Sequence, residues 1–387
     1  MKQDWKFKKL GDVCTVVGGS TPKTNIPEYW GGENYWVTPA ELTGEKYIES
    51  TERTITDEAV AKTNLTLLPV GTVLLSSRAP IGKVCITRSL MYCNQGFKNI
   101  VCSKCLYNEY VYWWLKGKTD YLNSLGVGAT FKEISKRTVE QIVIPVPPLS
   151  EQSRLVAELD LLTGIIDKQN AQLNELDTLA QSIFYDMFGD PIENEKGWNV
   201  KKLGDVCSLI TDGVHAKPVY VQEGIPFISV KDITTGKLVF DDVKYVSVSD
   251  HVTMSKRCPV AKGDILYTKV GATYGRPALV DTDREFSLYV SVALLKPKQD
   301  LVNNVFLCHQ MATDFVKHQA DKSIKGIGVP DLHLNMIRNF HILIPPKSLQ
   351  LVFNSKIASI ENQKAKIKAT IADTQKLLDY TMDKYFG

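Results

Sequence analysis

The sequence predicts an α+β protein in which two similar α/β-mixed globular domains are separated by two long helices, paired as an antiparallel coiled coil with an internal pseudo-two-fold. Three observations predict this fold. The 387-residue sequence contains an internal repeat that covers much of the chain. Each copy begins with short β-branched stretches bounded by Gly, Pro and Asn. Each copy ends in a long stretch with apolar residues at heptad spacing, which is typical of a coiled coil.

Short matching stretches align the two copies. Residues 5–14, WKFKKLGDVC, return as WNVKKLGDVC at residues 198–207. The other matched stretches are Gly71–Leu75 with Gly263–Tyr267, Ile142–Pro145 with Ile342–Pro345, and Phe188-Gly189 with Phe386-Gly387. The repeat predicts four segments: a first globular domain at residues 1–148, a first spacer helix at 149–190, a second globular domain at 191–347 and a second spacer helix at 348–387.

Both globular domains are expected to mix strands and helices. The predicted strands are β-branched and apolar, and they are Thr72–Leu75, Val84–Thr87, Ile265–Thr268 and Val290–Leu294. Two segments with helical periodicity follow them, Tyr107–Leu115 and Val305–Val316.

A pair of prolines precedes each long helix, at Pro147-Pro148 and Pro345-Pro346, and proline suits the start of a helix. The apolar residues expected to form the seam between the helices, and to contact partners, are Leu155, Leu159, Leu162, Ile166, Leu173, Leu176, Ile183, Phe353, Ile357, Ile360, Ile367, Ile371 and Leu378. An amphipathic helix that lies on its own domain is the alternative.

Charge favours pairing between the two helices. Residues 149–190 hold two basic and eight acidic residues, a net −6, whereas residues 348–387 hold six lysines and four acidic residues, a net +2. Opposite charges and a shared apolar seam both stabilise a helix pair, the seam more strongly. At about 1.5 Å per residue, helices of this length span about 55–60 Å and predict a spacer of fixed length.

Composition excludes several classes of protein. The sequence has no apolar run long enough to span a membrane and no secretory signal, so we expect a cytoplasmic protein without a membrane partner. The eight cysteines are scattered, and the CxxC at Cys102 and Cys105 lacks a second ligand pair, so no metal site is expected.

Two similar but diverged globular domains on a rigid spacer suit a ligand with two separated sites, and duplex DNA fits this description best. The loops at residues 76–83 and 268–276 are polar, basic and glycine-punctuated, and solvated hairpin turns are their alternative interpretation. The candidate DNA contacts are Thr21, Lys23, Ser77, Arg78, Lys83, Thr130, Lys132, Lys217, Thr268, Lys269, Tyr274, Arg276, Lys325 and His333.

Catalytic signatures are missing from the sequence. There is no phosphate loop, no methyltransferase motif and no nucleophile or metalloprotease motif. The glycine pairs at residues 126–132 and 325–330 lack the third glycine and the preceding strand of a dinucleotide site, so a plain loop is as good an interpretation. These observations favour a binding subunit over an enzyme.

The chain resembles the specificity subunit of type I restriction-modification systems over its whole length. The resemblance rests on residues 10–13 followed by GGSTP at 18–22, on the partner TDGVHAKP at 211–218, on GTVLLSSRAPIGK at 71–83 and on IPVPPLSEQ at 144–152. The second copy departs from the last motif, with IPPKSLQ at 344–350.

This resemblance implies two target-recognition domains, each reading one half of a bipartite DNA site. It also implies that the paired helices set the gap and dock two modification (methyltransferase) subunits, which restriction (translocase/nuclease) subunits join. No cofactor is then expected on this chain, because S-adenosylmethionine, ATP and Mg²⁺ belong to those partners. The alternatives are a combined restriction–methylation enzyme and a coiled-coil tether that binds two proteins.

Overall fold

The computed structural model describes residues 5–78, 80–128, 132–324 and 328–387. It divides into two compact units, unit 1 with residues 1–170 and 369–387, and unit 2 with residues 171–368. Unit 1 contains a globular head at residues 5–148 (head 1), and unit 2 contains one at residues 191–346 (head 2). Each unit therefore holds a head, the start of the long helix that follows this head, and the end of the other long helix.

The strands of head 1 are β1 (Lys6–Lys9), β2 (Cys14–Gly18), β3 (Trp30–Val37), β4 (Tyr47–Ile48), β5 (Thr54–Ile55), β6 (Val73–Leu75), β7 (Val84–Thr87), β8 (Tyr92–Cys93), β9 (Lys98–Cys102) and β10 (Val143–Val146). They form a five-stranded sheet in the order β2-β9-β6-β7-β4, a three-stranded sheet β5-β3-β8 and an antiparallel ribbon β1-β10. Its helices are α1 (Leu10–Val13), α2 (Asp57–Lys62), α3 (Asn108–Lys116), α4 (Thr119–Ser124) and α5 (Lys136–Gln141), with single 3₁₀ turns η1 (Pro27–Tyr29) and η2 (Pro39–Glu41).

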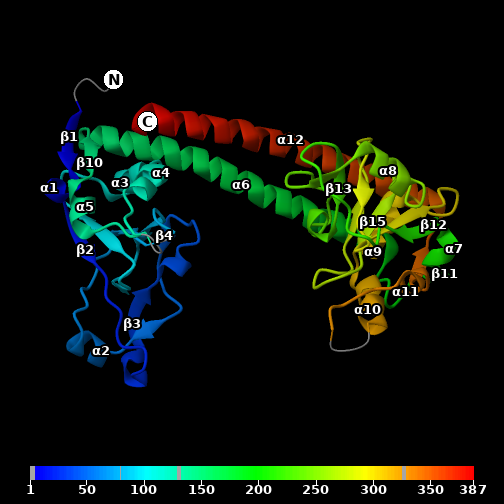
Figure 1. The fold of residues 1–387 in the computed structure, drawn as a ribbon, viewed down its shortest axis with the longest axis horizontal. Helices are drawn as coiled ribbons and strands as arrows, with labels where there is room; N and C mark the ends of the chain where they lie inside the picture. The colour runs from blue at the N-terminus through cyan, green and yellow to red at the C-terminus, as the bar shows by residue number, and fades with distance from the viewer. Residues whose placement is uncertain (1–4, 79, 129–131, 325–327) are drawn as a thin grey trace. The chain divides into compact units, whose positions relative to one another are not determined.

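The central strands β6 and β7 are buried on both faces, which explains their continuous apolar sequence. Side chains alternate along a strand, so Val73 and Leu75 pack in the core that contains α3, whereas Leu74 packs with Phe97 in a second core. In Figure 1, α2 and β3 lie at the end of head 1 that faces away from the long helix α6.

Head 2 repeats this plan. Its strands are β11 (Asn199–Lys202), β12 (Cys207–Asp212), β13 (Ile225–Ile228), β14 (Lys244–Val246), β15 (Ile265–Thr268), β16 (Pro277–Leu279), β17 (Ser287–Leu288), β18 (Val292–Pro297) and β19 (His341–Ile344). The sheets are β12-β18-β15-β16, β14-β13-β17 and the ribbon β11-β19. Its helices are α7 (Leu203–Val206), α8 (Val248–Ser255), α9 (Asn304–Met311), α10 (Asp314–Ser323) and α11 (Leu334–Arg338), with one 3₁₀ turn η3 (Val230–Asp232).

The segment predicted to be helical at Val305–Val316 is divided between two helices, because α9 ends at Met311 and α10 begins at Asp314. Thr313 takes an extended conformation, with φ −76° and ψ 157°, at the start of α10. Its hydroxyl donates to the carbonyl of Gln310 at 2.6 Å, so a local side-chain bond replaces a helical one.

The long helices are α6 (Leu149–Phe188) and α12 (Lys347–Phe386). In unit 1 the start of α6 and the end of α12 share a core that includes Leu159 and Phe386. In unit 2 the end of α6 meets the start of α12, and the rings of Phe188 and Phe353 lie 5.3 Å apart. The two helices therefore run antiparallel within each unit.

Every predicted seam residue is buried or half-buried. The buried members are Leu155, Leu159, Leu162, Phe353, Ile357 and Ile360. The half-buried members are Ile166, Leu173, Leu176, Ile183, Ile367, Ile371 and Leu378. The predicted fold class, two similar mixed heads and two long heptad-bearing helices, is confirmed.

The double prolines lead into a buried glutamine that repeats in both copies. Gln152 accepts from the amide of Tyr107 at 2.8 Å and donates to the carbonyl of Pro147 at 2.8 Å. Gln350 accepts from the amide of Asn303 at 2.7 Å and donates to the carbonyl of Pro345 at 2.8 Å. Although residues 344–350 depart from the motif of the first copy, the glutamine keeps its place and its partners.

Candidate nucleic-acid interface

Three loops that are distant in sequence meet in head 1, at residues 18–24, 76–83 and 132–135. The connecting segment is Cys93–Gly96, which accepts from the amide of Ser20 at 2.9 Å and from the amide of Ser77 at 2.7 Å. The amide of Ile134 donates to the carbonyl of Ser77 at 2.9 Å and joins the third loop. We call this set of loops the loop cluster of head 1.

The same cluster recurs in head 2, at residues 212–218, 268–276 and 331–333. The amide of Val214 donates to Leu288 at 3.0 Å, that of Lys269 to Ser291 at 2.9 Å, and that of Leu332 to Lys269 at 2.8 Å. The two heads thus share the same backbone hydrogen bonds in this cluster, whereas the side chains of the loops differ.

A glycine at the same place in each cluster is required by close backbone contact. A Cβ atom on Gly19 would lie 1.8 Å from the carbonyl oxygen of Asn94, and one on Gly213 would lie 2.0 Å from that of Leu288. Any side chain would push the first loop off the connecting segment, so the glycine fixes the approach of the two backbones.

The central hairpin loops are closed by a hydroxyl. The hydroxyl of Ser76 accepts from the amide of Lys83 at 2.9 Å and donates to the carbonyl of Pro80 at 2.7 Å. Thr268 accepts from the amide of Arg276 at 2.8 Å and donates to the carbonyl of Thr273 at 2.8 Å. Thr268, a predicted contact, is fully buried and holds the loop from inside.

Among the other predicted contacts of the central loops, Arg78 and Arg276 are exposed and Lys83 is half-buried. The Nε of Arg78 donates to Glu133 at 2.9 Å, and Lys83 donates to the carbonyl of Pro39 at 3.3 Å. The half-buried Tyr274 donates its hydroxyl to Asp321. Arg78 and Arg276 are therefore both exposed, Arg78 near the start of its loop and Arg276 at the end of the other, where Lys83 stands in head 1.

Two predicted contacts are directed inward. Ser77 is fully buried and donates to the carbonyl of Gly96 at 3.1 Å. The side chain of Lys269 is 6% exposed, and its ammonium lies 3.5 Å from Asp212 and 3.4 Å from Asp331.

Two tryptophan indoles donate hydrogen bonds to the backbone of the first loop of head 1. Trp36 donates its indole N–H to the carbonyl of Ser20 at 3.1 Å, and Trp30 donates to that of Lys23 at 3.3 Å. The guanidinium of Arg53 lies 4.0 Å above the ring of Trp30. Lys23 is exposed, whereas the hydroxyl of Thr21 donates to Gln95.

The remaining predicted contacts are exposed or lie outside the described residues. Lys132, Lys217 and His333 are exposed. Thr130 and Lys325 lie outside the described residues. The structure thus brings most of the predicted contacts into two equivalent clusters.

Sequence reasoning missed three side chains in or beside the loop clusters. Arg257 donates to the buried carboxylate of Asp212 at 2.8 Å, and the ring of His215 lies 3.4 Å from the same carboxylate. Arg53 belongs to head 1 and stacks on Trp30. His215 stands where the repeat places Thr21, which the alignment of the copies could have shown, but nothing in the sequence connects Arg257 to Asp212.

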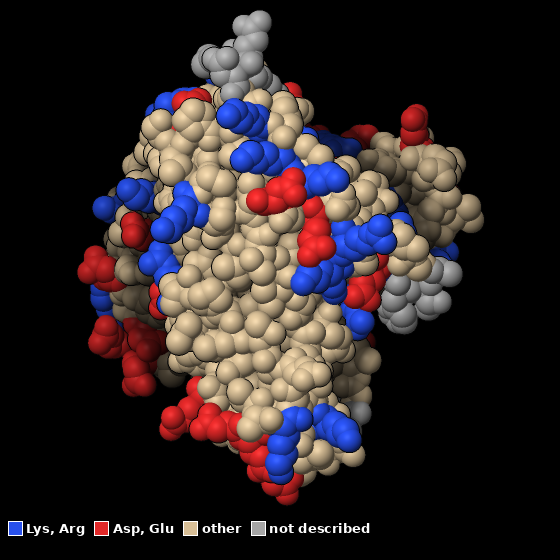
Figure 2. All heavy atoms as spheres, turned by 90° about the vertical axis from the view of Figure 1, so that its left-hand side faces the viewer, with Lys and Arg blue, Asp and Glu red and all other residues tan. Residues whose placement is uncertain are grey.

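One face of the molecule carries side chains of both charge signs. On the face drawn in Figure 2, Lys and Arg side chains are interleaved with Asp and Glu around a broad uncharged area. The face drawn there is therefore not uniformly basic.

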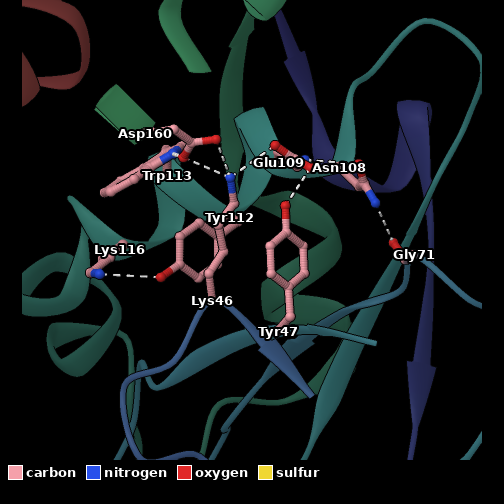
Figure 3. Close-up of polar contacts among 9 residues, drawn as sticks. All are labelled: Lys46, Tyr47, Gly71, Asn108, Glu109, Tyr112, Trp113, Lys116 and Asp160. Carbon is pink, nitrogen blue, oxygen red and sulfur yellow. Dashed lines mark hydrogen bonds and ion pairs between the residues drawn. The ribbon is translucent and has the colours of Figure 1, made fainter. Parts of the chain in front are cut away.

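A second polar network joins head 1 to the start of α6 (Figure 3). The ammonium of Lys46 lies 2.8 Å from Glu109 on α3 and 2.6 Å from Asp160 on α6. Asp160 also accepts from the indole of Trp113 at 2.8 Å. Burial opposes the charge of Lys46, but hydrogen bonds to the two carboxylates outweigh it and raise its pKa. The network fixes how α6 leaves head 1.

Unit 2 has a different network at the corresponding junction. Lys364 on α12 is 2% exposed, and its ammonium pairs with Asp177 on α6 and lies 2.7 Å from Glu361. The nearby imidazole of His309 is half-buried, and removal of the ring from water lowers its pKa to about 4. An interhelical ion pair of the predicted sign therefore occurs within this unit.

Within the described residues, no group of three or more His, Cys, Asp and Glu side chains is placed to hold a metal ion. In the same part of the chain, no helix combines the length and the apolar character needed to cross a membrane.

Comparison with known proteins gives consistent matches over both copies. The family model described as type I restriction modification DNA specificity domain matches residues 2–178 and 195–374. The chain is 32% identical to the type I restriction enzyme MjaIX specificity subunit of Methanocaldococcus jannaschii, over 94% of this chain and 89% of that one. It is 22% identical to the MjaVIII specificity subunit of the same organism, over 93% and 87%.

Solved structures share the fold. The S subunit of a type I restriction-modification system from M. genitalium matches with a TM-score of 0.55 at 12% identity, and the match covers 99% of this chain and 96% of that one. A chain from a structure of type I restriction-modification complex assembly and conformational transition matches with a TM-score of 0.61 at 19% identity, covering 99% and 97%.

Proposed function

Because the chain belongs to the family of type I restriction-modification DNA specificity subunits, we propose that each of its two recognition domains reads one half of a bipartite DNA site. The observation that carries the proposal is the pair of loop clusters. Their backbone frame is the same in both heads, but the outward side chains differ, as two half-sites of different sequence require. Loops on a rigid scaffold are the usual place for such variation.

The chemistry of the exposed side chains supports contact with DNA. Arg78 and Arg276 suit bidentate hydrogen bonding to guanine, and Lys23, Lys132 and Lys217 suit phosphate oxygens. The buried Ser77, Thr268 and Lys269 hold the loops in place in this proposal.

The proposed role of the long helices is to set the gap between the half-sites and to dock two modification subunits. The heptad seam supports a spacer role, because paired helices resist bending better than a linker. Leu161 on α6 and Leu377 on α12 are exposed, which leaves apolar surface for partners beside the seam.

In this proposal the chain is the non-catalytic DNA-reading part of a larger cytoplasmic assembly. Adenine methylation with S-adenosylmethionine takes place on the modification subunits, and DNA cleavage that uses ATP and Mg²⁺ takes place on restriction subunits. The side chains of the loop clusters are used for binding, orientation and internal ion pairs.

The proposal is tested by mapping methylated adenines in DNA from cells that carry this chain with its modification partner. We expect methylation at one bipartite sequence with a constant gap. DNA affinity of the purified assembly should fall steeply with salt, because phosphate contacts release counterions. A flat salt response and methylation without a bipartite sequence would instead favour a tether for two proteins.

A further inference from the structure

A shielded ammonium contacts the third loop of each loop cluster, but the two lysines occupy different positions in the two heads. In head 1 it belongs to Lys98 on β9, whose Nζ lies 3.1 Å from Glu133 and 3.3 Å from the hydroxyl of Ser77. In head 2 it belongs to Lys269, at the end of β15, whose Nζ lies 3.4 Å from Asp331 and 3.5 Å from Asp212. Their side chains are 12% and 6% exposed.

The strand register shows which positions correspond. Gly18 pairs with Lys98 between β2 and β9, and Asp212 pairs with Ala293 between β12 and β18. Lys269 takes the place of Ser77, because both residues donate their amide to the connecting segment and accept an amide from the third loop.

Three corresponding positions therefore differ between the copies. Head 1 has Gly18, Ser77 and Lys98 where head 2 has Asp212, Lys269 and Ala293. In head 2 the lysine is in the hairpin loop and not on the strand. The strand position of Lys98 is then occupied by Ala293, and the position of Gly18 is occupied by Asp212. The carboxylate of the third loop, Glu133 or Asp331, is kept in both copies and pairs with the ammonium in each.

We propose that Lys98 and Lys269 are positioning residues for half-site recognition, each of which locks the central loop of its cluster to the third loop. The proposal rests on the proposed function. A shielded ammonium is costly without a carboxylate partner, so the pair favours one arrangement of the two loops.

Each ion pair also reaches an exposed arginine. Glu133 accepts from Lys98 and from Arg78, at 3.1 and 2.9 Å. Asp212 lies near Lys269 and accepts from Arg257, at 3.5 and 2.8 Å. The buried ammonium thereby controls the direction of an arginine at the surface without contacting DNA.

The test uses the full chain assembled with its modification subunits and DNA libraries in which one half-site at a time is randomised. Lys98→Ala is expected to reduce sequence discrimination about tenfold or more at one half-site, while the other half-site stays as in the wild type. Lys269→Ala should do the reverse. Lys98→Arg should keep most of the discrimination, and Lys62→Ala, which removes an exposed lysine on α2, should change neither half.

The decisive variant transfers the arrangement of head 2 into head 1, as Gly18→Asp, Ser77→Lys and Lys98→Ala together. A Cβ on Gly18 meets no atom within 4 Å, so the site has room for the aspartate. This triple variant should regain discrimination that Lys98→Ala alone loses.

Unchanged discrimination in both Lys→Ala variants would overturn the proposal. So would an equal loss of methylation at every sequence with a lower melting temperature, because this pattern indicates a merely structural role. If the wild-type assembly itself shows no bipartite preference, the proposed function fails. That result can be distinguished from the two outcomes that overturn the positioning role, because both of those require a wild-type assembly that discriminates.

Discussion

Gln152 and Gln350 are completely buried at the junctions between heads and helices. A buried amide is tolerated only where its polar atoms have partners, and both residues satisfy this condition with backbone groups. The bond to the carbonyl of Pro147 or Pro345 ties the first turn of the helix to the residue that follows the preceding strand. Single residues therefore determine how each long helix begins, and the same residue type does so in both copies.

The exposed arginines of the central loops give a prediction at this scale. Arg78→Ala should weaken or relax recognition at one half-site by about 1–3 kcal/mol, because it removes one side chain able to bind a base edge. Arg276→Ala, which removes the exposed arginine of the other central loop, should act on the other half-site. The measurement is methylation of DNA libraries by the assembled complex. Equal loss at both halves would contradict reading by separate heads.

His309 gives a prediction about pH. Its pKa is lowered to about 4 by burial, whereas an unfolded chain has a histidine pKa of about 6.5. Above about pH 6.5 both states are neutral, and between about 6.5 and 4 only the unfolded state takes up the proton. Stability is therefore lost as pH falls through this range.

In urea unfolding, His309→Gln should make the stability difference between pH 7.5 and pH 5.0 smaller by about 1–2 kcal/mol. His318→Gln is the control, because this imidazole is exposed on α10. If His309→Gln loses as much stability between pH 7.5 and pH 5.0 as the wild type does, the imidazole of His309 does not cause the loss of stability in acid.

At the scale of elements, the sheets and long helices follow local patterns and the loop clusters do not. The strand predicted at Val84–Thr87 has the bounds of β7, and the helix predicted at residues 348–387 differs from α12 by one residue at each end. By contrast, the bond from Ser20 to Cys93 joins residues far apart in the chain. A contact between residues so far apart leaves no periodic pattern in the sequence. For the same reason the contact of Arg257 with Asp212 in head 2 could not be predicted.

The seam between α6 and α12 gives a prediction of the same scale. Leu159 is fully buried, whereas Leu161 on the same helix is 65% exposed. Leu159→Ala should lower the free energy of unfolding by about 2–5 kcal/mol, because it leaves a cavity. Leu161→Ala should change it by less than about 0.5 kcal/mol. Similar stabilities of the two variants in urea unfolding would argue against a packed seam in unit 1.

For the whole molecule, the proposed spacer role makes the helices set the distance between half-sites. Insertion of four residues near Gln169 breaks the heptad register, and it should alter the gap, rotate one head relative to the other or abolish activity. Full activity with unchanged spacing would remove the spacer role.

A matched insertion keeps the register and sharpens this test. Seven residues added to α6 after Gln169 and seven to α12 after Thr370 lengthen both helices by about 10.5 Å. This corresponds to about three base pairs of duplex at about 3.4 Å each. Methylated adenines should then map to the same two half-sites with a wider gap, or be lost if the heads no longer face the duplex together. Seven residues inserted at Gly44, in an exposed loop of head 1, should leave the gap unchanged.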